Sequence, residues 1–219
     1  MPTVVIASPK GGAGKSTAAI LLGTELAHAG ASVVMLDCDP NHSLTLWADR
    51  APLPDRIQVL SSVTESDIVK SIKQHDTDGQ IVVADLEGVA SRLVSRAISQ
   101  ADLVITPMRA TTLDATIGVR ALQLIAEEEE ALDRKIPYAV VFTMTKAVRS
   151  KQHSGIAESL AAQGVDLIDP PLMERAAFSA LFEFGGSLRS MPAQGNMSGA
   201  IENAALFAKA VYKRLAEGV

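Results

Sequence analysis

A glycine-rich octet near the N-terminus constrains this chain more than any other feature. Residues 10–17 read Lys-Gly-Gly-Ala-Gly-Lys-Ser-Thr, after the apolar run 3–7 and before an alanine-rich segment with helical periodicity. Strand, glycine loop and helix N-terminus together build a phosphate site, because glycines let backbone N–H groups approach an anion and the helix dipole favours negative charge. Lys15 is expected to reach the β- and γ-phosphates, and Ser16 to hold Mg²⁺ through its hydroxyl.

The octet departs from the common phosphate-loop pattern of Gly, four residues, Gly, Lys and Ser or Thr. Pro9 stands where that pattern has its first glycine, and Lys10 adds a second lysine. A glycine turn that carries two lysines by chance is the alternative interpretation. The strand–loop–helix context disfavours it, so the sequence predicts nucleotide binding.

Composition narrows the class of protein. The chain has 219 residues, of which 47% are hydrophobic, and this fits one α/β domain over 1–219. No apolar run approaches the roughly 18 residues of a membrane span, and the N-terminus lacks the pattern of a signal peptide. Cys38 is the only cysteine, which excludes an internal disulfide and Cys-based zinc or iron–sulfur ligation within one chain. A cytoplasmic location is expected.

Apolar runs alternate with segments of helical periodicity along the chain. Strands are expected at 3–8, 32–37, 56–61, 80–85, 102–107, 137–143 and 165–169. Helices are expected at 15–29, 43–50, 65–75, 90–100, 112–131, 150–163, 173–183 and 198–216. Several strands are continuous Val, Ile and Leu runs, typical of parallel strands buried on both faces. The pattern predicts an α/β fold of the P-loop NTPase kind, a doubly wound and mostly parallel sheet with helices on both faces.

Capping residues mark some of these helix ends. Thr64 and Ser198 are expected N-caps, and Gly30 and Gly164 are expected C-caps.

Two more strand ends carry acidic residues. Val33 to Leu36 runs into Asp37-Cys38-Asp39-Pro40, and Ile81 to Ala84 runs into Asp85. Carboxyl ends of parallel strands gather ligands at one edge of a sheet, so these acids are expected near the glycine loop. Carboxylates there can support Mg²⁺ and orient a hydrolytic water. An Asp-Pro turn with a capping aspartate is the alternative for the first pair.

With these motifs in place, the chain resembles the ParA/MinD-type deviant Walker A ATPases, most of all the short, ParF-type plasmid partition proteins. The matching segments are the octet 10–17, Asp37 to Pro40, Ser43 to Trp47, Asp85, Ala101 to Pro107 and Leu113-Asp114. The resemblance runs from residue 3 to about residue 190.

The resemblance implies roles for particular residues. Lys10 matches the family's signature lysine, which crosses an ATP-bound dimer to touch the partner's phosphates. Asp39 matches the aspartate that positions the attacking water, so Lys10, Lys15 and Asp39 are the expected catalytic residues. Ser16, Asp37 and Asp85 are the expected Mg²⁺ residues.

Nucleotide contacts are carried over in the same way. The resemblance assigns them to Lys10, Gly11, Gly12, Ala13, Gly14, Lys15, Ser16, Thr17, Thr143, Met144, Pro170 and Pro171, the last four toward adenine. The expected ligands are ATP or ADP with Mg²⁺.

Three segments depart from the family pattern. Asp85 is followed by Leu86-Glu87-Gly88 instead of a proline pair, and Asn41 stands where a glutamine is common. The segment after strand 102–107 is Met108 to Thr112 instead of a proline-rich stretch.

A lysine that acts in trans implies a two-chain site. Such a cation contributes about 10³–10⁵ in rate to phosphoryl transfer, so a lone subunit is expected to hydrolyse ATP slowly. The resemblance implies an ATP-dependent homodimer, possible higher assemblies, non-specific DNA, nucleoid association and a ParB-type centromere-binding partner that stimulates hydrolysis.

Support for DNA binding from the residues themselves is modest. At a net charge of −5, such binding needs a local basic patch. The candidates are Lys146, Arg149, Lys151, Arg175, Arg189, Lys209, Lys213 and Arg214. Ordinary surface charge explains them equally well.

Other functions of the same superfamily stay open. A MinD-like membrane ATPase would need a basic amphipathic tail, and the apolar stripe of Ile201, Ala205, Ala208, Tyr212 and Leu215 fits a core-packing helix better. No stable membrane anchor is therefore expected. A small-molecule ligase, or a positioning ATPase for conjugative DNA or a protein array, remains an alternative.

Overall fold

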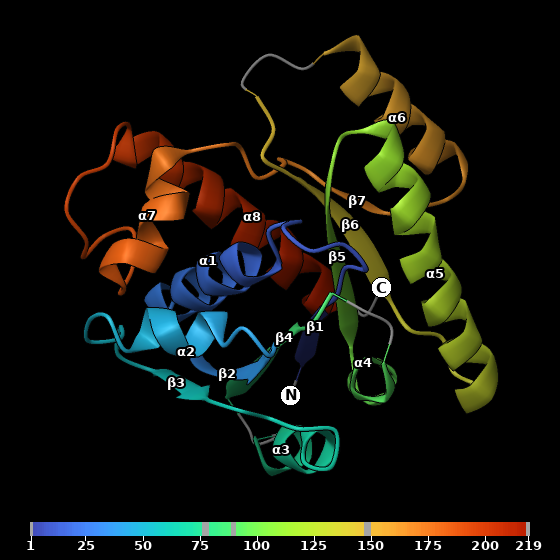
Figure 1. Ribbon diagram of the computed structural model, residues 1–219, viewed down its shortest axis with the longest axis horizontal. Helices are drawn as coiled ribbons and strands as arrows, with labels where there is room; N and C mark the ends of the chain where they lie inside the picture. The colour runs from blue at the N-terminus through green and yellow to red at the C-terminus, as the bar shows by residue number, and fades with distance from the viewer. Residues whose placement is uncertain (1, 76–78, 89–90, 147–149, 218–219) are drawn as a thin grey trace.

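Seven parallel strands form one sheet at the centre of the molecule (Figure 1). The computed structural model describes residues 2–75, 79–88, 91–146 and 150–217, with only the backbone of 113 and 115–121. The strands are β1 Thr3–Ile6, β2 Ser32–Cys38, β3 Ile57–Leu60, β4 Gln80–Leu86, β5 Leu103–Arg109, β6 Tyr138–Thr143 and β7 Leu167–Ile168. Their order is β3-β2-β4-β1-β5-β6-β7, and the expected parallel sheet is confirmed.

Helices cover both faces of this sheet, as expected. One face carries α1 Lys15–His28, α2 Ser43–Ala48, α7 Ala176–Phe184 and α8 Met197–Glu217. The other carries α3 Ile68–His75, α4 Arg92–Ile98 and α5 Thr112–Leu132, with α6 Lys151–Ala162 beside α5 over β6 (Figure 1).

Alternation along the strands explains the two cores. In β1, Val4 and Ile6 face the α1 side and Val5 faces the opposite side, and in β2 Met35 and Leu36 divide in the same way. Because both faces are covered, all of these residues are apolar and the strands read as continuous runs.

Helix ends agree with the sequence where the signal is a glycine. Gly30 and Gly164 have positive φ angles of 97° and 77° and end α1 and α6 as expected, but each stands one residue after the C-cap, which is Ala29 in α1 and Gln163 in α6. The N–H groups of each glycine and of the residue after it bond back to the last turn of the helix. Ser198 as an N-cap is wrong: it lies inside α8, and the Asn196 side chain accepts the N–H of Gly199 instead. Thr64 lies a full turn before α3, which begins at Ile68.

Several element boundaries also differ from expectation; for example, the strand expected at 3–8 ends at Ile6, and the helix expected at 90–100 spans Arg92–Ile98. The strand expected at 165–169 shortens to Leu167–Ile168, and the helices expected at 65–75 and 173–183 begin at Ile68 and Ala176.

Candidate functional site

The glycine loop lies at the carboxyl edge of the sheet, between β1 and α1. Gly12 and Gly14 adopt positive φ angles of 70° and 89°, which other residues adopt only at a cost. Gly14 is the N-cap of α1 and offers no side-chain acceptor, so the first N–H groups of the helix stay available to an anion. The local geometry is that of the expected phosphate loop.

Two side chains from the neighbouring strands hold this loop in place. The Thr143 hydroxyl donates to the Ala13 carbonyl at 2.8 Å, and the Arg109 guanidinium donates to the Gly12 carbonyl at 3.2 Å. The Thr143 hydroxyl therefore donates its hydrogen bond to the loop, whereas the family resemblance implied a contact with adenine. Arg109 was missed, because the contact joins residues 97 positions apart in sequence.

The strand ends bring the two predicted metal acids together. Asp37 and Asp85 are register partners on the adjacent strands β2 and β4, and both are fully buried. One Asp37 oxygen accepts from the backbone N–H and the hydroxyl of Thr45, at 2.8 and 2.6 Å. The other Asp37 oxygen and both Asp85 oxygens have no hydrogen-bond partner among the described residues.

These unpaired oxygens are electrostatically costly. Burial raises the pKa of Asp85 to about 7, with Asp37 and Asp39 adding to the rise, while Ser16 and Lys15 oppose it. A divalent cation would relieve this cost, and oxygen donors are what Mg²⁺ prefers.

The described residues fit a Mg²⁺ ion that is bound partly by the protein and partly by the nucleotide, rather than one held by protein ligands alone. No group of three His, Cys, Asp or Glu among them could hold a metal alone. Mg²⁺ at nucleotide sites takes only one or two protein carboxylates and completes its shell with phosphates and water. Ser16, Asp37 and Asp85 meet that requirement.

Asp39 stands on the turn after β2 with its carboxylate fixed. It is 8% exposed, and one oxygen accepts from both the backbone N–H and the side-chain amide of Asn41, each at 2.8 Å. Asn41, which departs from the family pattern, thus orients the predicted water-positioning aspartate. None of the described contacts uses the second oxygen, which can accept a hydrogen bond.

The first lysine of the octet, Lys10, forms an ion pair with an acidic residue of α5. Lys10 forms an ion pair with Asp114, which is buried and also accepts from the Thr111 hydroxyl at 2.6 Å. Burial tends to raise the pKa of Asp114, but hydrogen bonds from Lys10 and Thr111 outweigh it and leave the pKa below its usual value. Lys10 keeps a side-chain exposure of 31%, so it lies near the surface beside the loop.

The segment after β4 closes over the loop. A methyl group on Gly88 would lie 3.4 Å from both the Gly11 nitrogen and the Lys15 ammonium nitrogen. The backbone at Gly88 therefore lies beside the phosphate-binding groups.

A small pocket continues from the loop toward α7. Its lining includes Gly14, Thr17, Met144, Leu172 and Arg175. Met144 is 41% exposed, consistent with the predicted base contact. Pro170 and Pro171 do not line this pocket; the residues that follow them do.

Three of the eight basic DNA-binding candidates form ion pairs with acidic side chains. Arg189 pairs with Glu25, Arg214 with Asp166 and Lys213 with Glu217. Arg175 lines the pocket beside the loop. Arg149 lies outside the described residues, while Lys146, Lys151 and Lys209 are exposed.

Comparison with known proteins agrees with the fold and the loop. The family model VirC1 protein matches residues 1–215. The chain is 65% identical to Protein ParA of Rhizobium radiobacter over the full length of both. It is 29% identical to Protein virC1 of Rhizobium radiobacter, over 84% of this chain and 82% of that one.

A solved structure has the same fold. A putative plasmid partition protein from Borrelia burgdorferi B31, bound to AMPPNP, superposes with a TM-score of 0.73 at 18% identity, covering 97% of this chain and 99% of the other.

Proposed function

Because this chain belongs to the VirC1 and ParA family of P-loop ATPases, we propose that it is an ATP-dependent DNA partition ATPase. In this proposal ATP drives dimerisation, the dimer binds DNA without sequence preference, and a ParB-type partner stimulates slow hydrolysis. The observation that carries it is Lys10, a second lysine beside a phosphate loop that already has Lys15.

Lys10 has no obvious use within its own site. Lys15 is buried at the start of α1, where a phosphate-loop lysine is needed, whereas Lys10 lies near the surface on Asp114. A cation at the rim can serve a nucleotide held by a second chain. Its release from Asp114 then accompanies dimerisation, and the partner's triphosphate replaces the carboxylate as its counter-charge.

In this proposal, different residues bind the phosphates, bind Mg²⁺, orient the attacking water and stabilise the transferred group. Backbone N–H groups from Gly11 to Gly14, with Lys15, bind the β- and γ-phosphates, and Ser16, Asp37 and Asp85 hold Mg²⁺. When bound, Mg²⁺ supplies charge neutralisation at the phosphate oxygens. Asp39, oriented by Asn41, accepts a hydrogen bond from the attacking water and aims it at the γ-phosphorus. Lys10 of the second chain stabilises the charge that develops on the transferred group.

Oligomeric state under different nucleotides tests the dimer. Light scattering with a non-hydrolysable ATP analogue should give twice the mass measured with ADP, and Lys10→Ala should stay monomeric in both. Equal masses with the two nucleotides in the unmodified protein would remove the ATP-gated dimer from the proposal.

Retention of random duplex DNA tests the second part. The ATP-loaded dimer should retain DNA in low salt and release it as salt rises, because each neutralised phosphate adds to the salt dependence. Two weak patches on one dimer bind more tightly than one. A retention that is equal with ADP and ATP, or absent with both, would contradict DNA binding by the ATP form.

The MinD-like alternative has less support. No helix among the described residues is long and apolar enough to cross a membrane. The apolar side of α8, including Ala204, Phe207 and Val211, is buried against the sheet and α1, as in a core-packing helix. Sedimentation with liposomes and ATP would separate the two functions.

A positioning ATPase for another cargo is compatible with the same site. ATPase assays with DNA and with a small basic DNA-binding protein, together and apart, would distinguish the two. Stimulation only by both together supports partition.

A further inference from the structure

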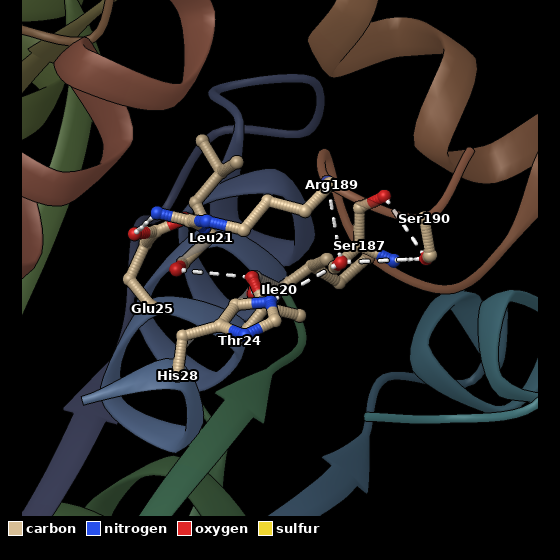
Figure 2. A network of polar contacts seen from close by, with 8 residues as sticks. All are labelled: Ile20, Leu21, Thr24, Glu25, His28, Ser187, Arg189 and Ser190. Atoms are coloured by element: carbon tan, nitrogen blue, oxygen red, sulfur yellow. Dashed lines mark hydrogen bonds and ion pairs between the residues drawn. The ribbon is translucent and has the colours of Figure 1, made fainter. Parts of the chain in front are cut away.

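A buried ion pair joins α1 to the loop between α7 and α8 (Figure 2). Glu25 is 6% exposed, and the Arg189 guanidinium donates to both of its carboxylate oxygens, one of them at 2.9 Å. The bidentate geometry satisfies the carboxylate and still leaves three of the five guanidinium N–H donors for other partners. Arg189 itself keeps a side-chain exposure of 36%.

The same loop is tied to two helices. The Ser187 hydroxyl lies 3.2 Å from Nε2 of His28 at the end of α1 (Figure 2), and the Trp47 indole of α2 donates to the Gly186 carbonyl at 3.0 Å. Backbone and side-chain bonds between Ser187 and Ser190 tighten the turn itself. Arg189 is therefore presented from a rigid loop, which suits a binding site.

A pocket opens beside this network, between the C-terminal part of α1 and α8. Its volume is about 620 Å³, within the usual range of ligand-binding clefts. Its wall is apolar and contains Leu26, Ala29, Ala31, Ala205 and Ala208.

Polar residues also line this pocket. They are Arg189, Lys209, His28 and Tyr212, and Tyr212 is 54% exposed although its ring is large and mostly apolar. An aromatic ring at the edge of an apolar cleft is a common anchor for a partner's side chain.

The charge of the pocket is positive on an acidic protein. Arg189 neutralises Glu25, which leaves the ammonium of Lys209 as the uncompensated charge among the lining residues. Burial, with the nearby Arg189, lowers the pKa of His28, so the imidazole is neutral at pH 7. The chain as a whole carries −5, so the charge of the pocket is opposite in sign to the net charge of the chain.

We propose that this pocket binds a segment of a partner protein in which an apolar side chain stands next to a carboxylate. The apolar wall and the Tyr212 ring receive the side chain, and Lys209 with the free donors of Arg189 receives the carboxylate. Nucleic acid fits less well, because a phosphate backbone offers nothing apolar to fill the cleft. The inference does not depend on the proposed ATPase cycle.

The pocket is remote from the nucleotide. It adjoins the C-terminal end of α1, whereas the phosphate loop precedes the other end. A helix of 14 residues spans about 20 Å, so an occupant would leave the nucleotide site open. The partner can therefore bind with either nucleotide present.

Disulfide tethering tests the proposal on the full chain. Cys38 is 5% exposed and burial raises the pKa of its thiol, so it stays silent in thiol exchange. Ala205→Cys places a thiol in the pocket, and Ala216→Cys places one on the exposed part of the same helix as a matched control. The probes are N-(3-mercaptopropionyl)-phenylalanine and its carboxamide, offered as mixed disulfides in excess reductant, with capture read by mass spectrometry.

The Ala205→Cys variant should capture the acid at least fivefold more than the amide, while Ala216→Cys should capture the two equally. Adding Lys209→Glu to Ala205→Cys should abolish this preference without touching the buried Glu25–Arg189 pair. Equal capture of both probes in the pocket would overturn the proposal, as would a preference that survives Lys209→Glu. Protection of Ala205→Cys by random duplex DNA would assign the pocket to nucleic acid and also overturn it.

Discussion

Asp85 and Asp37 are neighbouring buried carboxylates whose free oxygens have no protein partner among the described residues. Removing a carboxylate from water without pairing it destabilises the folded chain. The arrangement becomes favourable only when a cation and phosphates complete it. A site of this kind trades stability of the nucleotide-free protein for affinity toward the loaded state.

Asp85→Asn should therefore stabilise the nucleotide-free protein. With a folded pKa of about 7 against 3.8 when unfolded, the unfolded carboxyl loses its proton above pH 3.8 while the folded one keeps it up to about pH 7. Wild-type stability should therefore fall between these two pH values, and the variant should gain on the order of 5 °C in melting temperature at pH 8 but little at about pH 3.5. Calorimetry of both proteins, with exposed Asp55→Asn as control, checks this; a lower melting temperature for Asp85→Asn would contradict it.

Asp114→Asn removes the negative charge that pairs with Lys10. The amide keeps the size of the side chain but loses the charge, so folding should weaken by about 1 kcal/mol at pH 7. Because the folded pKa of Asp114 is lowered, its contribution is present above the unfolded pKa and disappears as pH falls through the folded one. Urea unfolding of wild type and variant should converge below about pH 3. A difference that persists unchanged in acid would show that packing, not charge, explains the effect.

Residues whose role is local could be predicted from the sequence. The octet, the acids at two strand ends and the glycines at two helix ends follow from backbone conformation and strand polarity, which a short segment encodes. Arg189 and Arg109 could not be placed, because their partners Glu25 and Gly12 lie 164 and 97 positions away. The same distance in sequence hid that Thr143 supports the loop.

At the scale of elements, the short loop after α7 decides how α1, α2 and α8 fit together. The end of α7, where this loop begins, was predicted within a few residues. The start of α7 lies three residues after the predicted one. The sequence of 173–175 does not mark this start, because the N-cap residue, Arg175, offers no capping acceptor. What fixes the loop is close contact with the end of α2 and the residues that follow it. A methyl group on Gly185 would lie 3.0 Å from the Trp47 carbonyl oxygen in α2, 2.6 Å from Cβ of Arg50 and 2.8 Å from the Ala51 nitrogen.

Gly185→Ala should consequently cost much more than an ordinary glycine substitution. Gly185 has a φ of 70° and no room, whereas Gly30 has a φ of 97° with open space around it. We expect a loss of about 3 kcal/mol or more for Gly185→Ala and about 1 kcal/mol for Gly30→Ala. Urea denaturation of the two variants measures both. Equal losses would mean that α2 can move aside and that the loop is not a rigid clamp.

At the scale of the whole molecule, the proposed function gives each chain two catalytic groups that act at different sites. In this proposal Asp39 serves the site of its own chain, and Lys10 serves the site of the partner. In the single chain Lys10 rests on Asp114, so formation of the dimer exchanges one counter-charge for another. If the proposal holds, hydrolysis depends on association of two chains. A chain without Lys10 and a chain without Asp39 are then inactive for different reasons.

Mixing two inactive variants distinguishes action in trans from action in cis. Lys10→Ala retains Asp39 but gives its partner no lysine, and Asp39→Ala retains Lys10 but cannot orient water. Because Lys10→Ala is not expected to pair with itself, its dimers form with the Asp39→Ala chain. Each mixed dimer has one complete site of two, so activity well above background, and at most about half of the wild-type ATPase activity, should return. Each variant alone should stay near background under the same DNA and partner conditions. If Lys10 acted on the nucleotide of its own chain, no mixed dimer would contain a complete site, and the mixture would remain as inactive as its components.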